Sequence, residues 1–355
     1  MMKSRKYILN LIIILIVTTL TVVFLISKNL LTLETIKTLS ITNVLSVFVV
    51  YLFSVLLYSL VNYLTVRQSL PDYKFYVAFS DIVFGRLGSD ITPLKSGHFP
   101  LRLYYLSKFG YSFYDGLLSV TKTQIVASFS SVINYAVLFV VLFFSKTVIT
   151  VNSYEVSLYL VVGVGLFFHI GSLFLVMALA FIKPFQSFCI NFVARLRFRN
   201  RELEREEFSK NQILKYSIYK EQIKLMLKDF LRYILPCFLY ILHMYIFSSA
   251  IYVSYLLTSS SPFDFSSFIS FYLLTLAISY ISNVIPIPGG NGSSEALFVV
   301  VFPILISSQS LLGSTLLLWR LSTYYLPVVF GLFVFFAWIP LYKRTGKKKA
   351  LQKVD

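Results

Sequence analysis

The chain has 355 residues, of which 57% are hydrophobic and 13% are charged. Soluble domains are on average about half apolar and about a quarter charged, so the bulk of this chain is not expected to lie in water. The same composition excludes a disordered chain, a collagen and a coiled coil. The formal net charge of +17 would also suit a nucleic-acid-binding protein, so the positions of the basic residues matter.

The basic residues cluster in three short stretches. Residues 1–6, 183–228 and 343–355 hold 20 of the 32 Lys and Arg residues and, with six acids among them, +14 of the net charge of +17. Such an excess is typical of cytoplasmic loops and tails of membrane proteins. We therefore expect a multi-pass protein of a bacterial-type cytoplasmic membrane with both termini cytoplasmic, basic loops that bind anionic headgroups, and no nucleic acid as a partner.

Long apolar runs predict the membrane spans. About 20 helical residues cross the roughly 30 Å hydrocarbon core. The first run follows three basic residues but lacks a signal-peptide cleavage site, so it is interpreted as an uncleaved span. The six clear runs are about 7–27, 41–66, 117–145, 156–182, 230–258 and 315–342. With 265–285 and 293–311 as further candidates, we expect about eight spans in an all-α, polytopic integral membrane helix bundle.

The composition changes along the chain predict four regions. Residues 1–182 form an N-terminal membrane half with a re-entrant element near 85–102, and residues 229–342 form a C-terminal half with a Pro/Gly turn. Between them, 183–228 is a basic cytoplasmic linker, interpreted as helix lying on anionic headgroups, and 343–355 is a basic cytoplasmic tail. Pro/Gly-interrupted segments in corresponding places of two related halves are typical of transporter binding sites.

The polar segment GRLGSDITPLKSGHFPLR, residues 85–102, interrupts the first half. Pro93 and Pro100 disfavour helix at the residues before them, and Gly97 permits a sharp reversal, so the segment predicts a re-entrant hairpin. The candidate residues for substrate binding and translocation in this half are Asp81, Arg86, Asp90, Pro93, Lys95, Gly97, His98 and Arg102.

The charges of this hairpin allow two interpretations. In the first, Lys95, His98 and Arg102 lie near the mouth of a cavity, where a lipid phosphate or carboxylate pairs with them, Arg102 through its bidentate guanidinium. In the second, Arg86 and Asp90, four residues apart, neutralise each other on one helix face, while Lys95 and Lys108 extend their ammonium groups to the membrane interface. For Arg102 the sequence leaves a structural role and a binding role equally open.

The second interruption is IPIPGGNGSSEALF, residues 285–298. Its prolines end one helix, its glycines form a close-approach turn, and the next helix N-terminus suits an anionic headgroup. Glu295 is either an ordinary capping acid or a cavity residue that receives an ammonium headgroup, and the cavity role is favoured because ionisable groups at membrane depth are usually functional. The candidate residues of this half are Pro288, Gly289, Gly290, Asn291, Gly292, Glu295 and Arg320.

Arg320 lies inside the last apolar run and requires a partner there. Glu295 is the predicted partner, and the pair would tie the Pro/Gly turn to the last helix. Enzyme signatures such as GxxxxGK[ST], HExxH and GxSxG are absent, and Cys189 and Cys237 form no metal-binding CxxC pair. His169 has no metal-ligating neighbour at helical spacing. No catalytic residue, metal or cofactor is therefore expected, and the chain is not expected to be an enzyme.

At these motifs the sequence resembles the transmembrane domain of the lysylphosphatidylglycerol synthase/flippase family, the membrane half of the bacterial multiple peptide resistance factor and its stand-alone relatives. The turn of that family usually reads PGGLG, whereas Asn291 replaces the apolar residue here. The matching residues are Ile91-Thr92-Pro93 with Gly97, Pro100 and Arg102; the turn Pro288 to Gly292 with Glu295; and Arg320 with Tyr324, Tyr325, Pro327 and Gly331.

The resemblance implies a lipid translocase that moves a charged-headgroup lipid, such as aminoacyl-phosphatidylglycerol, between leaflets and supports resistance to cationic antimicrobial peptides. A full-length resistance factor also carries a soluble aminoacyl transferase domain after its membrane half, whereas this chain ends at Asp355 after its basic tail, so lysyl transfer by this chain alone is not implied. The alternatives are a flippase for a polyprenyl-linked sugar or cell-wall precursor, a phosphatidylglycerol lysyltransferase-family protein that acts only with a separate synthase, and a non-transporting membrane scaffold. The expected partners are a membrane phospholipid or lipid-linked substrate, and a separate synthase or a second copy of the chain.

Overall fold

The computed structural model describes residues 19, 23, 26, 27 and 37, and residues 39–342 except 147, 152, 153, 198–201, 215 and 286. The predicted span 7–27 lies largely outside the described residues, and the basic tail 343–355 lies entirely outside them.

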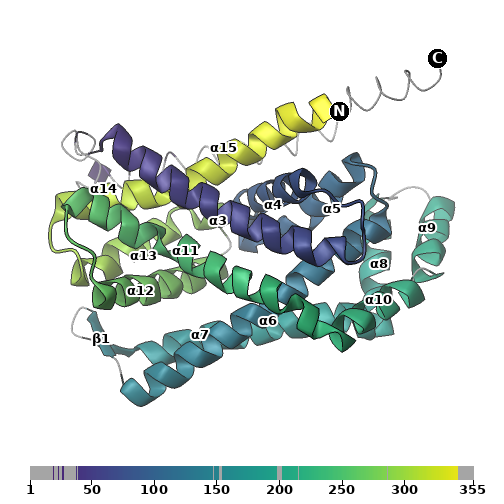
Figure 1. The fold of residues 1–355 in the computed structure, drawn as a ribbon, viewed down its shortest axis with the longest axis horizontal. Coiled ribbons are helices and arrows are strands. Elements are labelled where there is room, and N and C mark those ends of the chain that lie inside the picture. The colour runs from purple at the N-terminus through teal and green to yellow at the C-terminus, as the bar shows by residue number, and fades with distance from the viewer. Residues whose placement is uncertain are drawn as a thin grey trace.

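The described chain is helical apart from one antiparallel hairpin of two short strands (Figure 1), so the predicted all-α bundle is confirmed. The α-helices are α3 (Ile41–Arg67), α4 (Phe75–Asp90), α5 (His98–Lys108), α6 (Phe113–Ser145), α7 (Leu158–Phe181), α8 (Lys183–Arg197), α9 (Glu202–Leu214), α10 (Tyr216–Lys228), α11 (Ile234–Ser259), α12 (Phe265–Val284), α13 (Ser293–Val301), α14 (Gln309–Arg320) and α15 (Leu326–Phe333). The strands are β1 (Val148–Val151) and β2 (Tyr154–Ser157), and the short helical turns are η1 (Pro93–Lys95), η2 (Phe230–Tyr233), η3 (Pro288–Gly290), η4 (Phe302–Ile304), η5 (Leu321–Tyr325) and η6 (Val334–Trp338).

Five described helical stretches are long and apolar enough to cross a membrane: Ile41–Arg67, Phe113–Ser145, Leu158–Phe181, Phe230–Ser259 and Gln309–Tyr342. They match five of the six clear runs in the sequence. The candidate span 293–311 is wrong as a single helix, because α13 ends at Val301, the short turn η4 with Pro303 follows, and α14 begins only at Gln309. The predicted number of eight crossings is not confirmed.

The outer surface of these helices is apolar. Phe144 of α6, Phe167 of α7 and Phe336 of η6 are 78%, 74% and 70% exposed. Exposed aromatic side chains on long apolar helices, whose backbone groups are paired within the helix, suit contact with lipid and not with water. The surface therefore agrees with a multi-pass membrane protein.

The turns η1 and η3 share a sequence and a backbone pattern. Each begins at a proline, continues with two residues of positive φ, and is followed by a glycine immediately before the next helix. The positive φ values are 54° at Leu94 and 55° at Lys95 in η1, and 63° at Gly289 and 64° at Gly290 in η3. The hairpin α4–η1–α5 and the segment α12–η3–α13 therefore correspond, which supports the prediction of two related halves. Their tips, η1 and η3, contact each other.

Helices α8, α9 and α10 occupy the predicted linker 183–228 and gather at the end of the molecule opposite β1 (Figure 1). α10 is more than a helix lying on headgroups, since its Tyr219, Ile223 and Met226 are fully or almost fully buried. They pack into one hydrophobic cluster with Ile125 and Val126 of α6. The linker is thus fixed to the membrane bundle at its C-terminal end.

Candidate functional site

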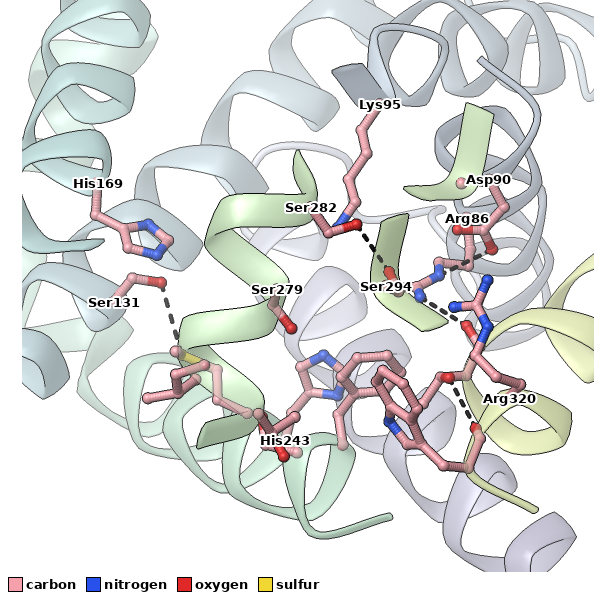
Figure 2. Close-up of a pocket in the computed structure, with 18 of the residues that line it drawn as sticks. Arg86, Asp90, Lys95, Ser131, His169, His243, Ser279, Ser282, Ser294 and Arg320 are labelled. Atoms are coloured by element: carbon pink, nitrogen blue, oxygen red, sulfur yellow. Dashed lines mark hydrogen bonds and ion pairs between the residues drawn. The ribbon is translucent and has the colours of Figure 1, made fainter. Parts of the chain in front are cut away.

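A polar cavity of about 270 Å³ lies where the two Pro/Gly tips meet. Its charged wall comes from α4, η1 and α14, and its neutral wall from α6, α7, α11 and α12. Figure 2 shows His169 and Ser131 on one side of the cavity and Asp90, Arg86 and Arg320 on the other. Among the described residues, four charged side chains line it: Arg86, Asp90, Lys95 and Arg320.

Arg86 and Asp90 form the first ion pair of the charged wall. Arg86 Nε lies 3.0 Å from Asp90 Oδ2, as two residues one helical turn apart allow. A second guanidinium nitrogen of Arg86 donates to the Thr323 carbonyl at 2.9 Å, and the guanidinium lies 4.7 Å from the centre of the Phe247 ring. The predicted neutralisation of Arg86 by Asp90 is therefore confirmed, and both side chains also line the cavity.

Glu295 and Arg320 form the second pair. Arg320 Nε lies 2.7 Å from Glu295 Oε1, so the pairing predicted from the sequence is confirmed. Glu295 Oε2 also accepts a hydrogen bond from the Gly292 N–H at 2.8 Å, and Arg320 donates to Asn291 Oδ1. The favoured prediction that Glu295 receives an ammonium headgroup is wrong, because its residue is 1% exposed and both carboxylate oxygens have partners. Glu295 is a capping acid that holds Arg320 against the Pro/Gly turn.

Lys95 is the third cation of the cavity. The nearby acid that acts on it electrostatically is Asp90, which is already paired with Arg86. Its side chain extends from the tip of η1 into the cavity (Figure 2), and it makes no ion pair or hydrogen bond with any described residue. Arg86, Lys95 and Arg320 carry three positive charges, and their neighbours Asp90 and Glu295 carry two negative charges. One positive charge at the tips is therefore uncompensated. This charge is available to an anionic group that enters the cavity.

Leu94, next to Lys95, has the left-handed φ of 54° and is 59% exposed. A left-handed conformation costs an ordinary residue roughly 1–2 kcal/mol, whereas glycine adopts it without steric strain. We expect Leu94→Gly to raise the free energy of unfolding by about 1 kcal/mol and Leu94→Val, which is β-branched, to lower it. Thermal unfolding of the purified protein in detergent measures both changes. A Leu94→Val protein as stable as the wild type would contradict the strained geometry.

Gly289 brings the second Pro/Gly turn close to the C-terminal end of α4. Its φ is +63°, and a Cβ added there would lie 2.4 Å from Tyr324 Cε2 and 2.7 Å from the Asp90 carbonyl oxygen. Because the Asp90 carbonyl is backbone, it cannot move aside as a flexible side chain would. Glycine is therefore required here for the contact between the turn and α4.

We expect Gly289→Ala to destabilise the protein by more than the roughly 1–3 kcal/mol that a left-handed φ alone costs. Gly110→Ala is the matched control, since Gly110 has a φ of +89° but no atom within 4 Å of an added Cβ. The difference between the unfolding temperatures of the two variants isolates the tip-to-tip clash. Equal unfolding temperatures would mean that the tips are not in close contact.

Arg102 does not lie at the cavity mouth, and that interpretation of its position is wrong. The residue is completely buried, with its Nε and one terminal nitrogen 3.0 Å and 2.6 Å from Asp81 Oδ2. The same terminal nitrogen donates to Asn62 Oδ1 of α3 at 3.0 Å. The close packing of α4 on α5 explains this position, since a Cβ on Gly85 would lie 2.6 Å from Arg102 Cγ. Asp81 and Arg102 thus join the first hairpin to α3.

His98 is also displaced from the predicted cavity mouth. Its ring packs within the hairpin, where Cε1 lies 3.1 Å from the Cβ position of Gly85, and it is not part of the cavity wall. Gly97 stacks on Gly88, whose added Cβ would lie 2.4 Å from the Gly97 carbonyl oxygen. The predicted hairpin therefore forms, but its close packing turns His98 and Arg102 away from the cavity.

The neutral wall contains residues that the sequence reading missed. Thr275, Ser279 and Ser282 of α12 line the cavity at the i, i+4, i+7 spacing of one helix face, and this polar stripe could have been noticed in the apolar run 265–285. His243 of α11 lines it too, fixed by a 2.9 Å contact between its Nδ1 and the Ser54 carbonyl. No group of three or more His, Cys, Asp or Glu side chains that could hold a metal occurs in the described part of the chain.

A comparison with protein families matches residues 8–331 to the family described as Lysylphosphatidylglycerol synthase TM region. The match includes both Pro/Gly tips and every residue of the cavity wall. Comparisons with curated proteins and with solved structures find no match to the chain. The family, the long apolar helices and the lipid-facing surface agree with one another. The chain therefore belongs to the family of the lysylphosphatidylglycerol synthase transmembrane region and is a multi-pass membrane protein with a function related to membrane lipids.

Proposed function

We propose that this protein is a lipid translocase, which moves a lipid with a charged headgroup between the two leaflets of the cytoplasmic membrane. The observation that carries the proposal is the cavity at the contact of the two tips, where Lys95 supplies a positive charge that no described acid neutralises. An uncompensated charge inside an apolar bundle is costly and is usually retained for a ligand. A phosphate group in the headgroup would compensate it.

The size of the cavity supports this proposal. Its volume of about 270 Å³ lies below the lower end of the roughly 300–1,000 Å³ range of drug-sized ligand pockets. Such a space suits a headgroup and not a whole lipid, so the acyl chains would stay in the bilayer. A headgroup that passes the tips would thus be shielded from the hydrocarbon core while its chains remain solvated by lipid.

Exchange between leaflets requires no covalent chemistry, so we propose that the chain is not itself an enzyme. A directional process would have to use an ion gradient or the membrane potential, which contributes about 2.3 kcal/mol per charge per 100 mV. Where the transported lipid is aminoacylated, a separate synthase would supply it. Translocation of aminoacyl-phosphatidylglycerol would place cationic lipid in the outer leaflet and support resistance to cationic antimicrobial peptides.

Leaflet exchange in vesicles tests the proposal. The purified full chain is reconstituted into phosphatidylcholine vesicles that carry fluorescent aminoacyl-phosphatidylglycerol or a fluorescent polyprenyl-phosphate lipid, and the fraction of tracer that a membrane-impermeant quencher reaches is followed in time. We expect at least one tracer to exchange faster than in protein-free vesicles. Exchange of both tracers, and of a fluorescent phosphatidylglycerol tracer in the same vesicles, at the protein-free rate would overturn the translocase proposal and favour a non-transporting scaffold.

A further inference from the structure

We infer that the lipid handled at this cavity is anionic and that its headgroup combines a phosphate with hydroxyl groups. This inference rests on the proposed translocase function and narrows its substrate class. Two observations carry it: the sign of the charge in the cavity and the unused hydroxyl groups on the neutral wall.

The charge balance favours an anion over a cation. Among the described residues that line the cavity, Asp90 is the one acid, and it is bound by Arg86, while Glu295 is buried behind Arg320. A lysyl headgroup would bring ammonium groups to a wall with no carboxylate left to pair with them, beside the positive charge of Lys95. Unpaired charges away from water carry a large desolvation cost, so a net cationic headgroup is disfavoured at this position.

The neutral wall suits hydroxyl groups. Ser248 of α11 and Ser279 of α12 line the cavity and make no hydrogen bond with any described residue. Ser282 and Ser294, on the two arms of the second Pro/Gly segment, lie next to them and share a 2.7 Å hydrogen bond. A serine hydroxyl can both donate and accept, which matches the hydroxyls of a glycerol or a sugar. A headgroup could place its phosphate against Lys95 and its hydroxyl groups in hydrogen bonds with the serines, and would then match both walls of the cavity.

Two lipid classes have this chemistry: phosphatidylglycerol and a polyprenyl-phosphate sugar. Vesicles of phosphatidylcholine with the reconstituted full chain would carry one of three fluorescent tracers: phosphatidylglycerol, a polyprenyl-phosphate sugar, or lysyl-phosphatidylglycerol. We expect one or both anionic tracers to exchange faster than the lysyl lipid by about tenfold, the factor that a modest charge preference in a partly desolvated site produces. The faster of the two anionic tracers would identify the lipid class.

Charge variants at Lys95 test the cause of the preference. Lys95→Gln removes the excess charge, and Lys95→Glu reverses it. Lys95→Gln should reduce the preference for the anionic tracers, and Lys95→Glu should shift it toward the lysyl lipid. Lys108→Gln is the matched control, because Lys108 is on the same hairpin but lies 4.8 Å from the Tyr104 ring and outside the cavity wall. Ser279→Ala should slow exchange of the phosphatidylglycerol and polyprenyl-phosphate sugar tracers. Ser270→Ala, on the same helix but outside the cavity wall, should not slow them.

The outcomes of these exchange experiments distinguish a failure of this inference from a failure of the proposed translocase function. Exchange of the lysyl lipid as fast as or faster than both anionic tracers would overturn the inference while the translocase function remains. Exchange of all three tracers at the protein-free rate would overturn the translocase function as well. A preference for anionic tracers that Lys95→Gln leaves unchanged would overturn the assignment of that preference to the cavity.

Discussion

Replacing Asp81 with Asn is expected to lower the free energy of unfolding by roughly 3–5 kcal/mol, the cost of breaking a buried ion pair by removing one partner. The side chains of Asp81 and Arg102 are completely buried, and the closest guanidinium nitrogen lies 2.6 Å from Asp81 Oδ2. In the variant, the guanidinium of Arg102 would keep its charge without a carboxylate and with no access to water. The unfolding temperature of the purified protein and its level in the membrane both measure the loss.

An exposed ion pair gives the matched control for this prediction. Lys224 Nζ and Glu221 Oε1 are 2.7 Å apart, close to the 2.6 Å of the buried pair, but their side chains are 50% and 61% exposed. Exposed pairs contribute little because water and salt screen them, so Glu221→Gln should leave the unfolding temperature nearly unchanged. If Asp81→Asn were as harmless as Glu221→Gln, the structural role assigned to the buried pair would be wrong.

Glu295→Gln is expected to destabilise the second Pro/Gly turn by about 3 kcal/mol, since it also removes one partner from a buried pair. Glutamine keeps the size of the side chain and can still accept from the Gly292 N–H, so the variant isolates the lost charge. The unpaired Arg320 would remain beside the cavity, with its hydrogen bond to Asn291 and its contacts with the Trp319 and Tyr324 rings but without a carboxylate. Destabilisation should therefore be accompanied by slower lipid exchange.

A double-mutant cycle with Arg320→Gln separates pairing from independent effects. If the two side chains stabilise each other, the double variant should be more stable than the sum of the two single losses predicts. The unfolding temperatures of the wild type and of the three variants give the coupling. Additive losses, or two single variants with wild-type stability and exchange, would exclude the pairing as a functional link between the turn and the last helix.

The sequence was most informative where proline, glycine or charged residues interrupt an apolar segment. Pro93 and Gly97, and the run from Pro288 to Gly292, interrupt long apolar segments, so both hairpin tips could be predicted. An acid and a base that each lie alone in an apolar segment are expected to pair, because an unpaired charge there is costly. The pair of Glu295 and Arg320 was therefore predictable. These inferences depend on local patterns and on the cost of burying charge, and both can be read from sequence alone.

The failed predictions depend on three-dimensional packing. The sequence left Arg102 open between the cavity mouth and a structural role. The structure shows the structural role, because the close contact of Gly85 with the Arg102 side chain packs α4 on α5 and Arg102 pairs with Asp81. The candidate span over 293–311 is broken by the short turn that contains Pro303, so α13 ends at Val301 and α14 begins only at Gln309. The neutral cavity wall was missed because serine and threonine are common in membrane helices, where they often bond their own backbone.

The most direct test of the account is the rate of lipid exchange in vesicles that contain Lys95→Gln or Lys108→Gln protein at equal amounts of folded chain. The uncompensated charge at the contact of the two tips is assigned to Lys95, whereas Lys108 lies outside the cavity wall. We predict that Lys95→Gln slows exchange of the preferred tracer by about tenfold or more, the loss expected when a charged hydrogen bond is removed. Lys108→Gln should keep the wild-type rate. Wild-type exchange by Lys95→Gln, or equal slowing by both variants, would contradict the assignment of translocation to this cavity.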